Sequence, residues 1–322
     1  MSILRSAGVL VLLAAFAIGA VSQAGGIREL GWAFPGLGPR AQRRPPDAVE
    51  SLPGSAAQYR WAQINSFYHV ADWYPDAHPP MPAVVRIGRR PRVAACAYCH
   101  LASGTGRPEN AALAGLPAWY ITAQLRNMRA GLRTDADPTW LPSKIMAEES
   151  DALAERDIAA AVAYFSGLHF TSHVRVIEAT EIPAFRDADF AYERLPGDRR
   201  EPLGDRIVEM PDSARGFALR DDRLTYTAYV PVGSVERGRL LALGRAGVVA
   251  CAVCHGAGLR GTSTAPPIAG RFPGYLFRQL LAFRTGTRHA SQDAPMDAET
   301  VRLTNDQMIA LAAYVASLGT TR

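Results

Sequence analysis

The sequence predicts an all-α protein built from two related domains, and composition, an internal repeat and helical periodicity support this fold class. The chain has 322 residues, of which 48% are hydrophobic and 20% charged. That composition is typical of folded proteins and excludes a disordered or fibrous chain. The length alone suggests about two domains.

The repeat is the strongest of these observations. Seven residues recur unchanged 155 positions further along the chain. They are Gly115, Tyr120, Gln124, Leu125, Arg129, Gly131 and Arg133, which recur as Gly270, Tyr275, Gln279, Leu280, Arg284, Gly286 and Arg288. Beyond them the offset falls to 150, where Met146 matches Met296 and Ala163-Tyr164 matches Ala313-Tyr314. The chain therefore carries two homologous copies, the first with a longer loop.

Each copy has apolar residues at the spacing of three and four positions that predicts helices. The first helix carries this pattern in both copies, at Ile121, Leu125 and Met128 and at Leu276, Leu280 and Phe283. The closing helix carries it at Ile158, Val162 and Phe165 in the first copy and at Met308, Leu311 and Val315 in the second. Thr304 and Gln307 form a capping box that predicts the start of the last helix. Because Ala154 replaces Thr304 in the first copy, we expect that copy's closing helix to begin a turn earlier, at Ser150.

The N-terminus has the layout of a secretory signal, predicted here as residues 1–24. Arg5 precedes an apolar run from Ala7 to Val21, followed by the small residues Ser22 and Ala24. The run is shorter than the ~20 residues that span a bilayer as a helix. We therefore expect an exported, periplasmic protein; an uncleaved N-terminal membrane anchor is the alternative.

The formal charge of +5 arises from 35 Lys and Arg against 30 Asp and Glu, and Lys144 is the single lysine. The basic residues are scattered, apart from a cluster at Arg40, Arg43 and Arg44. Nucleic-acid binding needs a basic face or a known module. The sequence has neither, so we expect no nucleic-acid partner.

All four cysteines lie in two C-x-x-C-H motifs, Cys96-Ala-Tyr-Cys99-His100 and Cys251-Ala-Val-Cys254-His255. This is the attachment signature of c-type haem, in which two thioethers hold the porphyrin and the histidine binds iron. Zinc sites, redox dithiols and disulfides are the competing interpretations. Paired zinc motifs usually lie ~15 to 20 residues apart, and a dithiol has no need of a histidine in both copies. The sequence predicts two covalently bound haem c groups.

Met146 and Met296 are the candidates for the sixth iron ligand, because they recur at matching places, in predicted loops before the closing helix. A methionine ligand suits electron transfer, whereas an open face suits oxygen or peroxide chemistry. Packing in the core is the alternative role for a methionine, and we assign it to Met128 and Met308. His289 is a rival ligand to Met296.

Four arginines and two tyrosines recur after the motifs and are candidate partners of the haem propionates: Arg129, Arg133, Arg284, Arg288, Tyr120 and Tyr275. Guanidinium groups match carboxylate geometry. A solvated helix face for the arginines and core packing for the tyrosines are the alternatives. Pro266 lies where its carbonyl could accept a hydrogen bond from the ring of His255 and raise that ring's basicity.

With these motifs, residues 83–168 and 233–318 resemble the class I dihaem cytochromes c of the c-four type, including the closing run from Ala312 to Leu318. The resemblance implies His100/Met146 and His255/Met296 ligation, all-α domains and periplasmic electron transfer. It has two departures. Ala111 and Ala112 stand where the second copy has Pro266 and Pro267, and the join between the domains is longer than the family's short linker.

We expect a signal (1–24), an N-terminal extension (25–82), cytochrome domain 1 (83–170), an insert (171–230) and cytochrome domain 2 (231–322). The insert has three β-favouring stretches, Val174–Ile177, Ile207–Val208 and Leu224–Val230, which predict a small β-rich or irregular unit without a catalytic site. The extension is rich in proline and carries Trp61, Phe67, Tyr68, Trp73 and Tyr74. We expect these aromatic residues to pack on domain 1, with a partner-docking surface as the alternative.

The sequence favours a non-enzymatic carrier that transfers electrons between redox proteins, with a dehydrogenase or cytochrome complex as donor and an oxidase or reductase as acceptor. A second hypothesis is the electron-accepting subunit of a periplasmic dehydrogenase complex. A third is a dihaem enzyme such as a peroxidase or thiosulfate dehydrogenase. An enzyme needs an open or unusually ligated iron, which the paired Met146 and Met296 disfavour.

Overall fold

The computed structural model describes residues 29–39 and 44–319. The predicted signal, residues 1–24, lies outside these ranges. Within them, no helix is both long and apolar enough to cross a membrane.

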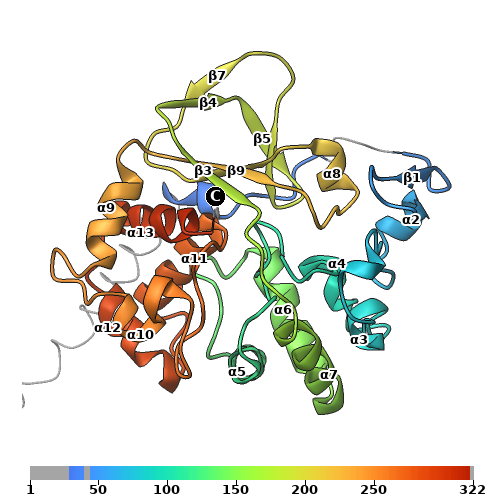
Figure 1. Cartoon of the computed structure of the whole chain (residues 1–322), viewed down its shortest axis with the longest axis horizontal. Helices are drawn as coiled ribbons and strands as arrows, with labels where there is room; N and C mark the ends of the chain where they lie inside the picture. Colours follow the sequence, from blue (N-terminus) through green and yellow to red (C-terminus); the bar gives the residue numbers. More distant parts are fainter. Residues whose placement is uncertain (1–28, 40–43, 320–322) are drawn as a thin grey trace, which may run out of the picture.

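The described helices fall mainly into two groups that follow the repeat. The first group contains α3 (Ala83–Arg86), α4 (Cys96–His100), α5 (Ala118–Arg129), α6 (Leu141–Ala152) and α7 (Glu155–Ser166). The second contains α9 (Ser234–Ala242), α10 (Ala252–His255), α11 (Pro273–Arg284), α12 (Ala294–Thr300) and α13 (Asn305–Ser317), with 3-10 turns η3 (Ala257–Leu259) and η4 (Ser291–Asp293). The two groups lie side by side in Figure 1, with the motif helices α4 and α10 far apart.

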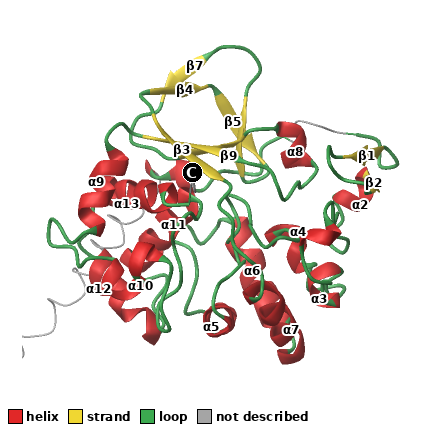
Figure 2. Ribbon diagram, viewed as in Figure 1, coloured by secondary structure: helices red, strands yellow, loops and turns green. Residues whose placement is uncertain are grey.

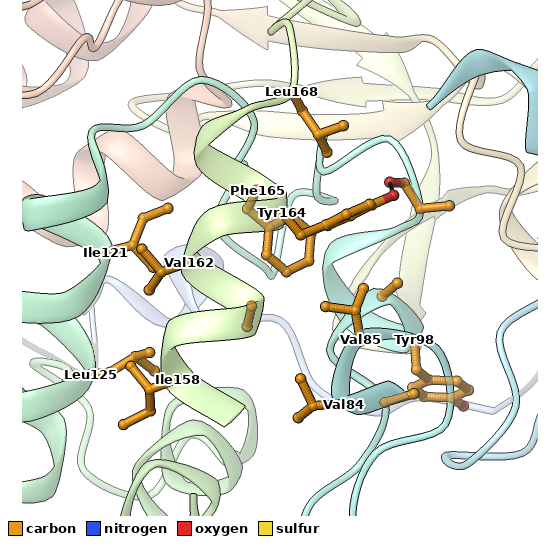
Figure 3. Close-up of a cluster of buried hydrophobic side chains, with 14 of the residues drawn as sticks. Val84, Val85, Tyr98, Ile121, Leu125, Ile158, Val162, Tyr164, Phe165 and Leu168 are labelled. Carbon is orange, nitrogen blue, oxygen red and sulfur yellow. Dashed lines mark hydrogen bonds between the residues drawn. The ribbon is translucent and has the colours of Figure 1, made fainter. Parts of the chain in front are cut away.

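The core of the first group forms on both sides of α7. Ile158 and Val162 face Ile121 and Leu125 of α5, as Figure 3 shows. On the other side, Phe165 and its neighbours pack toward α3 and α4, where Val84, Val85 and Tyr98 are buried. The hydroxyl of Tyr164 donates to the carbonyl of Ala102 at 2.7 Å. This core fixes the C-x-x-C-H helix α4 against the closing helix.

The second group is built around α13, which packs against α9 and α11. Gly238 lets α9 approach α13 closely, because a Cβ at this position would overlap the carbonyl of Ala310. Met308 is fully buried, as predicted for a core residue. The predicted capping box is confirmed: Thr304 accepts from the Gln307 backbone N–H, and the Gln307 side chain accepts from that of Thr304.

Two local predictions were wrong. The closing helix of the first group begins at Glu155 with Ala154 as its N-cap, not at Ser150. Ser150 lies inside α6, where its hydroxyl donates to the Met146 carbonyl at 2.7 Å. Met146 and Met296 are also not in loops, since they lie on helices α6 and α12.

The predicted all-α class is confirmed only in part, since the chain has 39% helix and 14% strand and most strands lie in the insert that we expected to be β-rich or irregular. Most strands lie between the two helical groups in the sequence and are drawn above the helices in Figure 2. They are β3 (Val174–Glu178), β4 (Glu181–Pro183), β5 (Phe185–Ala188), β6 (Ala191–Arg194), β7 (Arg200–Pro202), β8 (Val208–Pro211) and β9 (Tyr226–Val230), with the short helix α8 (Ala214–Ala218). The three stretches predicted as β-favouring correspond to β3, β8 and β9.

These three strands form one sheet in the order β3-β9-β8. β3 runs parallel to β9 with Val174 opposite Tyr226, and β8 runs antiparallel to β9 with Val208 opposite Tyr229. The pairs β4-β7 and β5-β6 are antiparallel and separate from this sheet. β3 also contacts α13, so the insert rests on the second helical group.

The N-terminal extension contacts both helical groups and the insert, and not domain 1 alone as predicted. It contains η1 (Gly31–Ala33), β1 (Val49–Ser51), β2 (Gln58–Arg60), α2 (Trp61–Ile64) and η2 (Pro75–Ala77). The ring of Trp32 lies 4.7 Å from that of Phe277 on α11. Trp73 is buried and donates its indole N–H to the carbonyl of Leu219 in the insert at 2.7 Å. Phe67 and Tyr68 do pack on the first helical group, as expected.

Candidate functional site

The first C-x-x-C-H motif forms the short helix α4, which presents a buried histidine. Nδ1 of His100 lies 2.8 Å from the carbonyl oxygen of Ala111. Because a carbonyl only accepts, Nδ1 carries the proton and the Nε2 lone pair is free for a metal. Burial lowers the pKa of His100, which keeps the ring neutral near pH 7.

The second motif repeats this arrangement at the same offset. Nδ1 of His255 lies 2.8 Å from the carbonyl oxygen of Pro266, and Pro266 stands 155 positions after Ala111. The predicted support of His255 by Pro266 is confirmed. Replacement of this proline by Ala111 in the first copy leaves the bond intact, because the acceptor is a backbone carbonyl.

The first motif opens into a cavity of about 1350 Å³, counting its open mouth. The walls come from α4, α5, α6, α7 and α11, so both helical groups contribute. The predicted site residues that line it are Cys96, Cys99, His100, Tyr120, Arg133, Met146 and Tyr275, together with Met128. Met146 thus shares a cavity with His100.

The residues of the second copy are placed in the same order but are more open to solvent. Cys251 is half-buried and Cys254 is exposed. His255 is buried, and Met296 is half-buried on α12. The side chain of His289, the rival ligand, is exposed.

The cavity fits a haem group with propionate side chains. The Nε2 amide group of Gln124 is buried and has no hydrogen-bond partner, and a carboxylate would supply the missing acceptor. Arg133 is buried and forms no ion pair with a carboxylate among the described residues, although its guanidinium donates to Gln124. A buried cation without a counter-charge is costly, so an anionic group beside it is favoured.

The competing interpretations of the cysteines receive no support from this geometry. Burial raises the pKa of the Cys96 and Cys99 thiols to about 12, whereas reactive dithiols have a lowered thiol pKa. The four cysteines are not joined in disulfides. Within the described residues, no group of three His, Cys, Asp or Glu side chains could hold a metal ion, as a zinc site would require.

Two arginines cross between the helical groups in a reciprocal network. Arg133 donates to the Tyr275 hydroxyl and to the Gln279 side-chain oxygen, both at 3.1 Å. Arg288 donates to the Tyr120 hydroxyl at 3.1 Å and to the same Gln279 oxygen at 2.9 Å. Each arginine thus contacts the repeated tyrosine of the opposite copy. The structure brings these four predicted site residues together at the interface.

The backbone supports the same contact. The amide of Thr134 donates to the Thr287 carbonyl at 2.8 Å, and that of His289 donates to the Leu132 carbonyl at 3.0 Å. Burial opposes ionisation of the Tyr120 hydroxyl, but nearby Arg288 and Arg133 outweigh it and lower the Tyr120 pKa. Arg288 already pairs with the Asp293 carboxylate at 3.3 Å, so among the described residues Arg133 is the arginine of this network that faces an added carboxylate without a competing ion pair.

Arg129 and Arg284 each bond to groups within their own helical group. Arg129 donates to the carbonyls of Ser150 and Leu153 at 3.0 and 2.6 Å. Arg284 donates to the Leu303 carbonyl at 3.0 Å and to the Asn305 side chain at 2.7 Å. Both guanidinium groups brace the junction before the closing helix. The structure does not bring these two arginines into the network of Arg133 and Arg288, and their assignment to haem propionates stays a prediction.

Sequence reasoning missed a repeated glutamate next to each motif. The Glu149 carboxylate accepts from the backbone N–H of Ala94 at 3.2 Å, and that of Glu299 accepts from Val249 at 3.0 Å. Ala94 and Val249 each stand two residues before the first cysteine of a motif. The signal was present, because Glu149 and Glu299 share the 150-residue offset of the two methionines.

Comparison with known proteins supports this interpretation of the site. Residues 236–319 match the family model of cytochrome c. The thiosulfate dehydrogenase electron acceptor of Stutzerimonas stutzeri is 28% identical over 235 residues, which are 72% of this chain and 82% of that protein. Cytochrome c4 of Pseudomonas aeruginosa is 40% identical over 81 residues, 23% of this chain and 36% of that protein.

Among solved structures, a thiosulfate dehydrogenase from Marichromatium purpuratum is similar with a TM-score of 0.46 and 30% identity, covering 71% of this chain and 38% of that one. The cytochrome c family match supports covalently bound haem c at the motif that it contains, Cys251–His255. Residues 236–319 therefore resemble cytochrome c, and the chain is similar over longer or shorter stretches to a protein described as an electron acceptor and to a cytochrome c4.

Proposed function

We propose that the protein is a dihaem electron carrier that accepts electrons from a thiosulfate dehydrogenase in the periplasm. Its haem domains would be residues 83–170 and 231–322, joined by the insert 171–230 and preceded by the extension 25–82. The duplicated histidine geometry carries this proposal, since both motif histidines have the same Nδ1 bond to a carbonyl at matching positions. The donor is proposed from the name of the relative in Stutzerimonas stutzeri.

Cys96 and Cys99 would hold the first haem through thioethers, and His100 and Met146 would bind its iron. Cys251, Cys254, His255 and Met296 would do the same in the second domain. Bound haem supplies a one-electron Fe(III)/Fe(II) couple. The carbonyls that accept from the two histidines increase imidazole basicity, and a thioether ligand raises the reduction potential.

The interface residues would hold the haem propionates. Arg133 and Arg288 are buried and carry positive charge, and Tyr120 and Tyr275 place hydroxyl groups beside them. Gln124 offers an unpaired N–H group at the same place. These residues would neutralise the propionates and exclude water from the contact between the two domains.

Spectra of the oxidised holoprotein test the ligand assignment. We expect Met146→Ala and Met296→Ala each to remove about half of the methionine-to-iron charge-transfer band, because each iron loses its thioether ligand. Met128→Leu is the matched control, since Met128 lines the first cavity but is assigned to packing. An undiminished band in both alanine variants would refute the ligands, and a high-spin wild type would favour an enzyme.

The donor is tested by mixing the oxidised protein with a thiosulfate dehydrogenase and thiosulfate. We expect both haems to become reduced, which is measured by the change in their absorbance. Absence of reduction by the enzyme, in a protein that ascorbate does reduce, would refute this donor and leave the ligand assignment standing.

A further inference from the structure

The two C-x-x-C-H motifs have the same spacing but differ in their exposure to solvent. The residue just before the second cysteine of the first motif, Tyr98, is 5% exposed. Its counterpart in the second motif, Val253, is 71% exposed. Because both residues occupy the same place in a short helix, the difference comes from the segments that cover each motif.

The N-terminal extension covers the first motif from one side. The amide of Ala95, just before Cys96, donates to the carbonyl of Phe67 at 2.7 Å. The rings of Phe67 and Tyr98 have their centroids 4.8 Å apart. Phe67 is itself exposed, so it forms the outer layer over the motif. In Figure 1 the extension, with β1 and α2, lies at the same end of the molecule as α3 and α4.

The insert completes this covering. The guanidinium of Arg220 stacks 3.6 Å from the centroid of Tyr98, and its NH1 group donates to the Tyr98 carbonyl at 3.0 Å. The extension and insert are fastened together by the buried bond from Trp73 to Leu219. We call residues 61–74 and 217–222 together the cover. In the described ranges, 29–39 and 44–319, neither segment has a counterpart over the second motif.

The second motif is surrounded instead by exposed apolar side chains, which we call the second-motif patch: Leu243, Val249, Val253 and Val301. Two bonds hold their segments together. The amide of Cys251 donates to the carbonyl of Ala242 at 2.9 Å, and Glu299 accepts from Val249. The motif helix α10 and α12 lie together in Figure 1, away from the extension. Exposed apolar side chains on segments held together in this way are typical of interaction sites.

The charge beside the patch is positive. Arg245 lies between Leu243 and Val249 in the sequence, and Arg302 follows Val301. Both arginines are exposed, and neither forms an ion pair within the described part of the chain. The hydrogen bond from the Val249 amide does not remove the charge of the Glu299 carboxylate, so the two arginines exceed that carboxylate by one positive charge. Unpaired positive charge beside an apolar face complements a partner with an apolar centre and an acidic rim.

We propose that the second-motif patch is the docking face for such an acidic redox protein, and that the cover closes the first motif to docking. This inference rests on the proposed dihaem function. It assigns different roles to two domains that the repeat makes look equivalent: one meets the partner, while the other is screened at its motif by the chain's own additions. The cover and the patch together thus determine where a partner can bind.

Binding of an oxidised flavodoxin, a small acidic electron-transfer protein, tests the proposal without relying on turnover. The holoprotein and flavodoxin are titrated at low salt, and the bound complex is mapped by hydroxyl-radical footprinting. We expect protection of Val249, Val253 and Val301 and no protection of Phe67. Val301→Glu and Arg302→Glu each weaken binding about tenfold, whereas Phe67→Glu, the matched exposed control on the cover, changes it less than twofold.

Protection of Phe67, equal weakening by Phe67→Glu, or absence of binding at low salt would each overturn the docking proposal. The haem content of the same preparation is measured as the pyridine complex. One haem per chain would refute the dihaem function, whereas two haems with protection at Phe67 would refute the docking face alone.

Discussion

The glutamate pair beside the motifs allows a prediction in which two similar contacts have different energies. Glu149 and Glu299 each accept a hydrogen bond from a backbone amide two residues before a motif. The amide of Ala94 belongs to a residue that is 7% exposed, whereas Val249 is 50% exposed. Water can therefore replace the glutamate at Val249 and not at Ala94.

We expect Glu149→Ala to cost about 2 kcal/mol of unfolding free energy, because a buried amide left without an acceptor costs ~1–3 kcal/mol. Glu299→Ala should cost less than about 0.5 kcal/mol, as surface substitutions usually do. Glu149→Gln keeps an acceptor oxygen and should recover most of the loss. A cost of 2 kcal/mol corresponds to about a 30-fold change in an equilibrium constant.

The assay combines urea unfolding with hydrogen exchange of the two amides by NMR. In Glu149→Ala the Ala94 amide should exchange about 30-fold faster, whereas in Glu299→Ala the exchange of the Val249 amide should change by about twofold or less. Equal losses in the two alanine variants would refute the burial argument. Failure of Glu149→Gln to recover stability would show that packing, and not the hydrogen bond, matters at this position.

Three further predictions concern the insert, the extension and the second helical group. Burial raises the pKa of Glu209 to about 8 from 4.5, so its neutral form stabilises the fold fully below pH 4.5 and that stability is lost as pH rises through 8. The stability advantage of Glu209→Gln over wild type should therefore grow by about 4 kcal/mol from pH 5 to pH 9, as measured by thermal unfolding; an advantage that does not change with pH contradicts this. Trp73→Phe removes the buried bond to Leu219 and should cost ~1–2 kcal/mol in urea; an unchanged midpoint would exclude that bond as an anchor. Gly238→Ala should cost ~1–3 kcal/mol by overpacking α9 against α13, and Gly31→Ala, which has open space around it, is the control whose equal loss would contradict the argument.

The repeat made much of the site predictable. A residue that recurs at one offset occupies the same place in two copies, so Tyr120, Arg133, Tyr275 and Arg288 could be selected from the sequence alone. The bond from His255 to Pro266 was predictable for a different reason, because it depends only on local chain geometry after the motif.

The methionines lie on helices and not in loops because the prolines near them do not prevent helix formation. Pro142 and Pro295 lie in the first turn of α6 and α12, where proline is tolerated because its missing N–H group has no helical partner there. For Arg129 and Arg284, recurrence indicates a shared role without saying which one. Both have a shared role, but it is to brace a helix junction.

The cover could not be predicted, because it depends on contacts between distant parts of the chain. Phe67 and Arg220 are 153 residues apart in the sequence and lie on either side of Tyr98. Aromatic residues in the extension indicated that it packs somewhere, but propensity and periodicity describe neighbours along the chain. Burial of one motif and exposure of the other emerge only in the folded protein.

The reciprocal arginine contacts make the junction isologous, as in a two-fold symmetric homodimer, although both halves belong to one chain. Arg133 is bonded to Gln124 of its own half and to Tyr275 of the other, and Arg288 reaches Tyr120 across the same junction. No change in these residues is therefore confined to one domain. A substitution made here to tune one of the two proposed haem sites is therefore expected to alter the other, and independent changes are expected only at the outer faces of the two helical groups.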